Sequence, residues 1–421
     1  MALKKEKRSR EKLQRISNEP DEINISDDEL EEAATAVNPY YSKVASVYSA
    51  VRYLLLAVLV LFIAVSAIRN SDGITYDNLM FLMKDLGSVA EASEGNFGKI
   101  TYNPDTTLSF SGFRNNLAVV TSSGLKIYKG DGSLIFGGED KFSRPNIETS
   151  DRYLLVYDFG GNSFALYNSF ARIHKEKFDY DITGADISNS GMFAVVTRTR
   201  EYNSAVMLYT KNCKLKNRYL SEDRVIDVAI NDAGNRLCIL SFDAENASYV
   251  TRIKIMKPGE NSPVTTLELS DIFPLSCNFT SDGNLTVLCD KALYFYDEDG
   301  NLLGSYVFGG ELLGAELDKK AAVVISSENS LGASGGIAVL GSEGEVIYKN
   351  LIYEKVVSSA YCDGYLFTVS GNVLTRVNVK TEAVMSREIS GGGKNMVVYS
   401  ADDVMICSNS SAEYFDFSDK E

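Results

Sequence analysis

The feature that most constrains this chain is a hairpin of two short apolar strands that recurs along most of its length. GLKIYKGDGSLIF and ALYFYDEDGNLLGSYVF are two examples, each with a turn between runs rich in Val, Ile, Leu, Tyr and Phe. The turns lie near Gly132, Ser169, Cys213, Gly259, Gly300, Gly344 and Thr381. The steps between them are 37 to 46 residues, the length of one four-stranded propeller blade. The sequence therefore predicts an all-β fold with the blade as its repeating unit.

A second series of turns falls between the first, and each joins two apolar runs as the inner hairpin of a blade. These turns are Phe113 to Asn116, Ser150 to Arg152, Asn189 to Gly191, Asp232 to Asn235, Ser281 to Asn284, Asp318 to Lys320, Asp363 to Gly364 and Ala401 to Asp403. There are eight inner hairpins but seven outer ones, because the sequence stops soon after SAEYFDF, where an eighth outer turn would begin. One outer strand is therefore missing at the C-terminus.

The missing strand is predicted at Gly98 to Asn103 (GKITYN), which has no partner in the first blade. If it supplies the outer strand of the last blade, the ring closes without an open edge. Residues 98–421 are therefore predicted to form an eight-bladed β-propeller, and seven blades are the alternative if one weak repeat is a loop. A pair of β-sandwich domains is the rival architecture, but a sandwich has no reason to keep a period of about 42 residues.

Residues 51–70 form a segment of a different kind. Val51 to Ile68 reads VRYLLLAVLVLFIAVSAI, an apolar run whose one charge, Arg52, lies at its edge. This length predicts an uncleaved signal-anchor helix that crosses the lipid bilayer once. A cleaved signal peptide is the competing interpretation, but its apolar core would be about 7 to 15 residues long and close to the N-terminus.

The flanking segments suggest an orientation. Residues 1–50 contain a basic block, Met1 to Ile16, and an acidic block, Glu19 to Glu32, which predict a disordered charged tail. The basic block favours a cytoplasmic N-terminus, and hence a propeller outside the cytoplasm at the cell membrane. Residues 71–97 contain Thr75 to Gly87, whose spaced apolar positions predict a short juxtamembrane helix before a linker.

The charge of the chain limits its partners. The formal net charge is −15 at pH 7, and an acidic surface repels phosphate polymers. Nucleic acid is therefore excluded as a predicted partner.

Histidine chemistry is almost absent from this sequence. The only histidine is His174, in the strand-like run FARIHKEKF, where alternation predicts a surface position on an outer strand. A Ser-His-Asp triad would have to use it, and a histidine-based zinc site would need several imidazoles. No catalytic residue, cofactor site or metal site is predicted.

Acidic residues are too numerous for spacing to select a catalytic pair. Asp179 with Asp181, Asp227 with Asp232, and Glu316 with Asp318 all read as turn or strand-edge acids. A hydrolase that uses carboxylates at the centre of the ring therefore stays open as an alternative.

Six cysteines are spread over the repeats, without a C-x-x-C pair. They are Cys213, Cys238, Cys277, Cys289, Cys362 and Cys407. Most fall in predicted strands, as small buried hydrophobic residues do. Cys277 and Cys289 flank the hairpin CNFTSDGNLTVLC symmetrically, which leaves a disulfide between them open beside two free thiols.

The turn YDEDGN crowds acidic side chains around Gly300, as calcium loops do. A full EF-type loop needs a bidentate acid about twelve residues after the first ligand, and that position from Asp297 is Phe308. KGDGS and GSEGE occupy the same place in other repeats, so the pattern predicts a tight turn rather than a ligand set. Ser326 to Gly336 and Asp243 to Ser248 are predicted to be loops between blades and are candidate contact edges.

Hairpins such as IYKGDGSLIF and FYDEDGNLLGSY resemble those of quinoprotein-like and WD-type propellers. The full layout, with a charged tail, one span, the TYDNL helix, GKITYN and the blades, is similar to an uncharacterised family of single-pass, membrane-anchored propeller proteins from clostridia-type Firmicutes. That resemblance implies a fold and a location but no activity. The chain has no Trp, so neither quinone-cofactor docking motifs nor Trp-Asp dipeptides are present.

Two hypotheses about function follow from the sequence. The first is a membrane-anchored extracytoplasmic scaffold whose propeller binds a protein, peptide or cell-wall polymer, since a ring of blades is a rigid platform that needs no catalytic residue. The second is an extracytoplasmic hydrolase or lyase that uses the central carboxylates. The first is favoured because no nucleophile and base are paired by spacing.

Overall fold

The computed structural model describes residues 47–48, 51–58, 60, 99–102, 107–169, 171–245, 248–327 and 335–418. The chain divides into two compact units, Met1–Lys84 and Asp85–Glu421. In the first unit, residues 51–58 are helical. Within the described residues, no helix is both long and apolar enough to cross a membrane. Most of the predicted span and all of the predicted helix at Thr75 to Gly87 lie outside the described residues.

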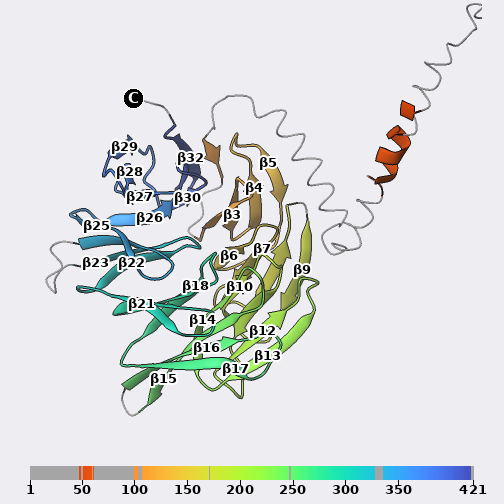
Figure 1. Ribbon diagram of the computed structural model, residues 1–421, viewed down its shortest axis with the longest axis vertical. Helices are drawn as coiled ribbons and strands as arrows, with labels where there is room; N and C mark the ends of the chain where they lie inside the picture. The colour runs from red at the N-terminus through yellow and green to blue at the C-terminus, as the bar shows by residue number, and fades with distance from the viewer. Residues whose placement is uncertain are drawn as a thin grey trace, which may run out of the picture. The chain divides into compact units, whose positions relative to one another are not determined.

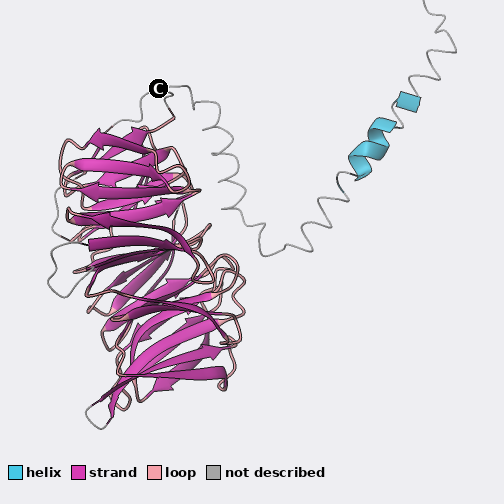
Figure 2. Ribbon diagram, turned by 60° about the vertical axis from the view of Figure 1, so that its left-hand side comes forward, coloured by secondary structure: helices cyan, strands magenta, loops and turns pink. Residues whose placement is uncertain are grey.

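The second unit consists of eight four-stranded antiparallel sheets, which are the blades of a propeller (Figures 1 and 2). Blades 1 and 2 contain β2 (Ser109–Phe113), β3 (Asn116–Thr121), β4 (Gly124–Tyr128), β5 (Leu134–Gly137), β6 (Pro145–Thr149), β7 (Leu154–Asp158), β8 (Ser163–Tyr167) and β9 (Arg172–Lys177). Blades 3 and 4 contain β10 (Ile182–Ile187), β11 (Phe193–Thr197), β12 (Ser204–Tyr209), β13 (Leu215–Ser221), β14 (Arg224–Ile230), β15 (Leu237–Glu245), β16 (Ser248–Met256) and β17 (Pro263–Ser270).

The remaining blades repeat this order. Blades 5 and 6 contain β18 (Pro274–Phe279), β19 (Leu285–Cys289), β20 (Ala292–Tyr296), β21 (Leu302–Val307), β22 (Leu312–Leu317), β23 (Ala322–Ser327), β24 (Gly335–Leu340) and β25 (Val346–Ile352). Blades 7 and 8 contain β26 (Val356–Cys362), β27 (Tyr365–Ser370), β28 (Val373–Asn378), β29 (Val384–Glu388), β30 (Asn395–Val398), β31 (Asp403–Cys407), β32 (Ser411–Asp416) and the N-terminal strand β1 (Ile100–Thr101).

All eight predicted inner hairpins and all seven predicted outer turns are present. The closing strand is also confirmed, because β1 pairs with β32 through Ile100 opposite Ala412 and Thr101 opposite Ser411. The hydroxyl of Tyr102 adds hydrogen bonds to the carbonyl oxygens of Ser408 and Ser411, at 2.7 and 2.8 Å. The inner strands β2 and β30 lie in contact, so the first and last blades meet and the ring has no unpaired edge there. The eight-bladed prediction is therefore correct.

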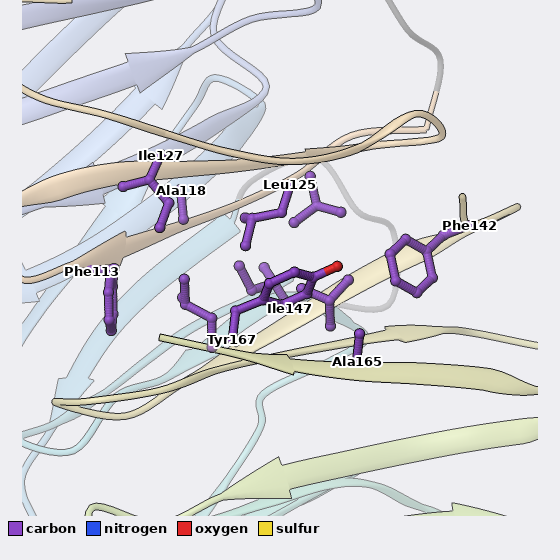
Figure 3. Close-up of a cluster of buried hydrophobic side chains, with 11 residues drawn as sticks. Phe113, Ala118, Leu125, Ile127, Phe142, Ile147, Ala165 and Tyr167 are labelled. Atoms are coloured by element: carbon purple, nitrogen blue, oxygen red, sulfur yellow. The ribbon is translucent and has the colours of Figure 1, made fainter. Parts of the chain in front are cut away.

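The middle strands of most blades are largely buried on both faces. Every residue of β7, β11, β19 and β23 is buried, because neighbouring blades cover both faces of these strands. In contrast, the outer strand β17 alternates between exposed and half-buried residues. Figure 3 shows one of the cores between blades, where Ile147 and Tyr167 of blade 2 meet Phe113 and Leu125 of blade 1.

The strands of each blade end at two opposite faces of the propeller, and these faces carry different loops. One face carries the inner and outer hairpin turns, and we call it the turn face. The other carries the connections between blades and the loops between the second and third strands, and we call it the connection face.

On the turn face, neighbouring inner hairpins are tied by hydrogen bonds. Arg114 donates to the carbonyl of Asp151 at 2.6 Å, and the backbone N–H of Ser190 donates to the carbonyl of Asp232 at 3.1 Å. Near the ring closure, Arg376 of β28 contacts Oδ1 of Asp402 at 2.5 Å. These bonds hold the positions of the inner strands around the axis.

Candidate functional site at the centre of the ring

The inner strands bring four carboxylates together around the ring axis. Glu148 lies on β6, Asp186 on β10, Asp227 on β14 and Glu316 on β22. The negative charges of the other three all raise the pKa of Glu148, so the four groups lie within electrostatic range of one another. All four side chains keep some exposure, and Glu316 is the most open. We call these four residues the axial carboxylates.

Burial by the surrounding blades raises the pKa of each axial carboxylate. The pKa of Asp227 rises to about 7 and that of Asp186 to about 6, although backbone hydrogen bonds act in the opposite direction on both. Burial also raises the pKa of Glu316 to about 6, with a smaller contribution from Asp318. These groups therefore titrate near neutral pH, because the blades remove water that would otherwise stabilise their charges.

Two of the axial carboxylates join neighbouring blades. Oδ1 of Asp186 accepts from the backbone N–H of Ile187 at 2.7 Å, and its Oδ2 accepts from that of Ile230 on β14 at 2.6 Å. One blade further on, Asp227 accepts from the backbone N–H groups of Val228 at 2.9 Å and Cys277 at 3.0 Å. Both side chains thus have a structural role between inner strands.

Lysine or arginine does not neutralise these groups directly. None of the axial carboxylates forms an ion pair with another described residue. The positive charge of Lys319 lowers the pKa of Asp186, but its Nζ lies 2.5 Å from Oδ1 of Asp232. The centre of the ring therefore holds acidic groups without basic partners, and burial favours their protonated forms.

A β-bulge recurs at the start of the inner strand in five consecutive blades, from blade 3 to blade 7. In each, one residue is skipped in the pairing with the second strand. These rim residues are Thr183, Ile226, Leu275, Leu313 and Val357. The inner strand has no neighbour on its axial side, so the rim residues lie at the entrance to the axis on the connection face.

The rim residues are apolar in four of the five blades, and three of these apolar residues are open to solvent, while Ile226 is half-buried. Leu313 is 59% exposed, Val357 47% and Leu275 38%. Nearby on the same face, Val307 at the end of β21 is 70% exposed, and Tyr353 in the connection from β25 to β26 is 81% exposed. Exposed apolar side chains therefore occur at several places on the connection face of blades 5 to 7.

The sequence-predicted residues fall mostly elsewhere. His174 lies on the outer strand β9, as predicted, with its Nε2 3.2 Å from Oε2 of Glu176. Asp179 and Asp181 lie in the connection between blades 2 and 3, whereas Asp232 and Asp318 lie in inner hairpins. Asp227 and Glu316 do reach the axis. The neighbouring charge that raises the pKa of Asp227 is that of Asp186 rather than Asp232, whereas the charge of Asp318, the acid paired with Glu316 by spacing, does raise the pKa of Glu316.

Cys277 and Cys289 are free thiols, so the disulfide left open by the sequence does not form. The strand register gives the reason, because Cys277 pairs with Val287 and Cys289 pairs with Pro274. The hairpin pairs Phe279 with Leu285 and is therefore centred on Asp282, not on Gly283 as the symmetric sequence pattern suggests. The side chain of Cys277 instead meets that of Cys238.

The YDEDGN turn is a tight turn, as predicted. Oδ1 of Asp297 accepts from the backbone N–H groups of Asp299 at 3.0 Å and Asn301 at 2.8 Å. Gly300 has φ +92°, a conformation that glycine adopts without strain. Across the part of the chain that the structure describes, no cluster of three or more His, Cys, Asp or Glu side chains could hold a metal ion.

The two predicted contact loops lie within blades, between the second and third strands, and not between blades as the sequence suggested; both belong to the connection face. Ser326 to Gly336 joins β23 to β24, and Asp243 to Ser248 spans the tip between β15 and β16. Residues 328–334 and 246–247 of these loops lie outside the described residues.

The rim residues were not predicted from the sequence. They do have a sequence signal, a three-residue pattern at the start of the inner strands. It consists of an apolar residue, the rim residue and then a small or acidic residue. The pattern reads ITG at 182–184, VID at 225–227, PLS at 274–276, LLG at 312–314 and VVS at 356–358. Alignment of the repeats on their inner turns would have shown it.

Comparison with solved structures supports the fold. BamB from Moraxella catarrhalis superposes with a TM-score of 0.52 at 14% identity, over 77% of this chain and 98% of that protein. Sqt1 from Saccharomyces cerevisiae gives 0.57 at 10% identity, over 76% and 98%. Sqt1 from Chaetomium thermophilum, solved bound to the N-terminus of the ribosomal protein L10, gives 0.54 at 10% identity, over 76% and 98%. At these identities the likeness shows the propeller fold alone.

No curated protein sequence matches this chain. The resemblance to an uncharacterised propeller family is confirmed for the fold and for the absence of a known activity, while the membrane anchor and the bacterial group stay predictions. Residues 98–417 match a family described only as being of unknown function, and the chain belongs to that family, DUF5711.

Proposed function

We propose that this protein is a membrane-anchored, non-catalytic binding module whose propeller lies outside the cytoplasm and holds a protein, peptide or cell-wall polymer. The observation that carries the proposal is the exposed apolar surface of the connection face, where Tyr353 and Val307 are open to solvent. Exposed apolar regions on folded proteins commonly mark interaction sites. Propellers commonly bind proteins, and the solved complex of Sqt1 is an example in that protein.

The location rests on the N-terminal sequence. The apolar run Val51 to Ile68 is long enough for one crossing, and the basic block before it favours a cytoplasmic N-terminus. A reporter that is active only outside the cytoplasm, fused after Glu421, tests this part. Activity of the fusion supports the location, and activity of a cytoplasmic reporter in its place contradicts it.

Site-specific cross-linking tests the binding role. A photo-reactive amino acid is placed at Tyr353 on the connection face of the full-length chain, and at Leu302 on the turn face as the control. Leu302 starts β21 and is 59% exposed, so both positions are accessible. We expect one discrete cross-linked species from position 353 and none from position 302. Equal products from both positions, or none from either, would overturn the proposal.

A hydrolase remains the second candidate, because the structure does bring carboxylates together at the axis. Glycosidases pair a carboxylic acid that has a raised pKa with a second carboxylate. However, Asp186 and Asp227 are occupied by backbone N–H groups between blades, which favours a structural role. Turnover of a glycan panel by the full-length protein, lost in Glu148→Gln, would establish the hydrolase instead.

A further inference from the structure

We propose that the outer edge of blade 3 makes a second contact between this protein and the membrane, by binding the surface of an anionic lipid bilayer. In this contact Lys214, Lys216 and Arg218 meet the lipid head groups, and Leu215 and Leu220 enter the interface below them. We call these five residues the basic edge. The inference rests on the membrane-anchored part of the proposed function, and it adds a surface of the propeller that faces the bilayer.

Positive charge is concentrated at this place in an otherwise acidic chain. From Lys211 to Arg218 the sequence carries four basic residues and no acidic one, in the outer turn of blade 3 and the start of β13. The outer turns of blades 5 and 6 occupy the same place in their sheets, and they carry Asp297 to Asp299, and Glu343 and Glu345. The basic edge therefore has the opposite sign of charge to these equivalent parts of the ring.

The structure presents the basic edge to solvent. Lys214, Lys216 and Arg218 are exposed, and they form no ion pair with another described residue. Leu215 is 51% and Leu220 46% exposed. β13 is the outermost strand of its sheet, so no further strand of the blade lies outside these side chains (Figure 1). Exposed leucines beside basic side chains fit a lipid surface, because that surface offers both acyl chains and negative head groups.

Contacts with the next blade hold β13 in place. The side-chain amide of Asn217 donates to Oδ1 of Asn261 at 3.0 Å, and the backbone N–H of Gly259 donates to the hydroxyl of Tyr219 at 2.8 Å. Both bonds join β13 to the outer turn of blade 4. Because side chains alternate along a strand, Arg218 lies on the opposite face of the sheet and stays exposed. The exposed row therefore has a fixed place at the edge of the ring.

The negative net charge of the chain does not prevent this contact. Residues 109–270, which form blades 1 to 4, contain 20 Lys and Arg against 19 Asp and Glu, whereas residues 271–421 contain 10 against 22. The excess of negative charge therefore lies in blades 5 to 8, and in a ring of eight blades, blade 7 lies across the axis from blade 3. Salt screens charges beyond about 8 Å, so the bilayer responds to the nearest side chains. Each basic residue at an anionic surface strengthens binding by about fivefold.

The chain between the predicted span and the propeller permits the contact and favours the bilayer as the occupant. Thirty residues separate Ile68 from Lys99, and a chain of that length reaches up to about 100 Å. β1 runs towards the connection face, so the chain enters it from the side of the turn face, where Leu215 begins β13. An anchored propeller meets the bilayer at a high effective concentration, so a few basic residues suffice. A soluble anionic polymer has neither this advantage nor an apolar layer for the leucines.

A single introduced tryptophan tests the contact, because the chain itself has no Trp. The full-length Leu215→Trp protein is reconstituted into vesicles of phosphatidylcholine, or of phosphatidylcholine and phosphatidylglycerol in equal parts, with brominated acyl chains that quench a nearby indole. Both leaflets have the same composition, so the direction of insertion does not matter. Leu302→Trp is the matched control. Leu215 and Leu302 each begin an outer strand opposite the last tyrosine of the third strand, and they are 51% and 59% exposed.

We expect quenching of the Leu215→Trp protein to be about twofold or more stronger in vesicles with phosphatidylglycerol than in those without it, and added salt to remove the difference. The Leu302→Trp protein should show weak quenching that does not depend on lipid charge. Equal quenching of the two proteins, or no effect of phosphatidylglycerol on the Leu215→Trp protein, would overturn the inference.

Charge variants in the Leu215→Trp background identify the residues responsible. The test variant combines Lys214→Gln, Lys216→Gln and Arg218→Gln. The control variant combines three exposed lysines of blade 7 and its connections, Lys355→Gln, Lys380→Gln and Lys394→Gln. Both variants change the net charge equally, and we expect only the test variant to lose the effect of phosphatidylglycerol. An equal loss in the control variant would show that net charge rather than the basic edge governs the contact, and would overturn the inference.

Further outcomes separate this inference from other occupants and from the proposed function. A change in emission of the Leu215→Trp protein on addition of inorganic polyphosphate, without quenching in vesicles, would show a soluble anionic polymer as the occupant and overturn the inference. A discrete cross-link from position 353 without lipid-dependent quenching would leave the proposed binding role standing without this inference. Failure of the full-length protein to enter vesicles would contradict the anchor on which both rest.

Discussion

Oδ2 of Asp186 accepts a hydrogen bond of 2.6 Å from the backbone N–H of Ile230 on the neighbouring inner strand. Asp227 makes the equivalent bond to Cys277 one blade further on. Acidic side chains therefore link blades 3, 4 and 5 close to the axis, where the sheets have no pairing between them. The same carboxyl groups have raised pKa values, so the stability of the ring depends on their protonation.

Removal of one link should destabilise the ring. Asp227→Ala leaves two backbone N–H groups without their acceptor, and we expect the free energy of unfolding to fall by about 2 kcal/mol. Asp227→Asn should lose less, because the amide oxygen still accepts one bond. Asp181→Ala is the control, since its pair with Arg198 is 4.0 Å long and exposed, and a change within about 0.5 kcal/mol is expected. Urea denaturation measures all three, and an equal loss in Asp181→Ala would contradict a specific role of the link.

The propeller should lose stability as pH rises from about 5 to about 7. The folded-state pKa values of Asp186, Asp227 and Glu316 lie above their unfolded values, at about 6, 7 and 6. In this window the folded state binds more protons than the unfolded state, so the free energy of unfolding falls with pH and levels off above about 7.

The size of this pH effect should be on the order of a few kcal/mol, because one pKa unit corresponds to about 1.4 kcal/mol. Glu316 contributes least, since solvent screens its more exposed side chain. Urea unfolding at a series of pH values provides the measurement. The combined variant Asp186→Asn with Asp227→Asn should flatten the slope, and an unchanged slope would show that other groups govern the pH dependence.

Ring closure should depend on one buried side chain of the N-terminal strand. Ile100 is 2% exposed and packs in the core between blades 8 and 1, so Ile100→Ala should lower the free energy of unfolding by about 2 to 4 kcal/mol. Thr101 is exposed on the same strand, and Thr101→Ala should change stability by less than about 0.5 kcal/mol. Thermal unfolding followed by circular dichroism distinguishes them. Similar melting of both variants would show that β1 does not secure the ring.

Substitution of two turn glycines should distinguish the cost of backbone strain from the cost of steric crowding. Gly300 and Gly283 have nearly equal φ values of +92° and +90°, but a Cβ added at Gly300 would lie 2.4 Å from Cγ2 of Thr265, whereas nothing lies within 4 Å at Gly283. Gly283→Ala should cost about 1 kcal/mol from the backbone alone, and Gly300→Ala about 2 kcal/mol or more. Denaturant midpoints of the two variants test the difference. Equal costs would mean that Thr265 moves aside without penalty.

The sequence by itself determined the blade count, the positions of the turns and the closing strand, because alternation, glycine turns and strand length are local properties. GKITYN could be assigned to the last blade because a count of strands shows which one is missing. By contrast, the register of the hairpin between β18 and β19 is set by its turn, which centres the pairing on Asp282 rather than Gly283 and so places Cys277 opposite Val287 instead of Cys289.

Only the tertiary structure decided what the centre of the ring contains. Glu148, Asp186, Asp227 and Glu316 are separated by whole blades in the sequence, and each resembles an ordinary strand acid there. They converge because the inner strands of a closed ring share one axis, and burial by both neighbouring blades then shifts their pKa values. The exposure of Leu313 and Val357 was likewise fixed by ring geometry, since an apolar residue at the start of a strand is buried or exposed according to what its neighbours cover.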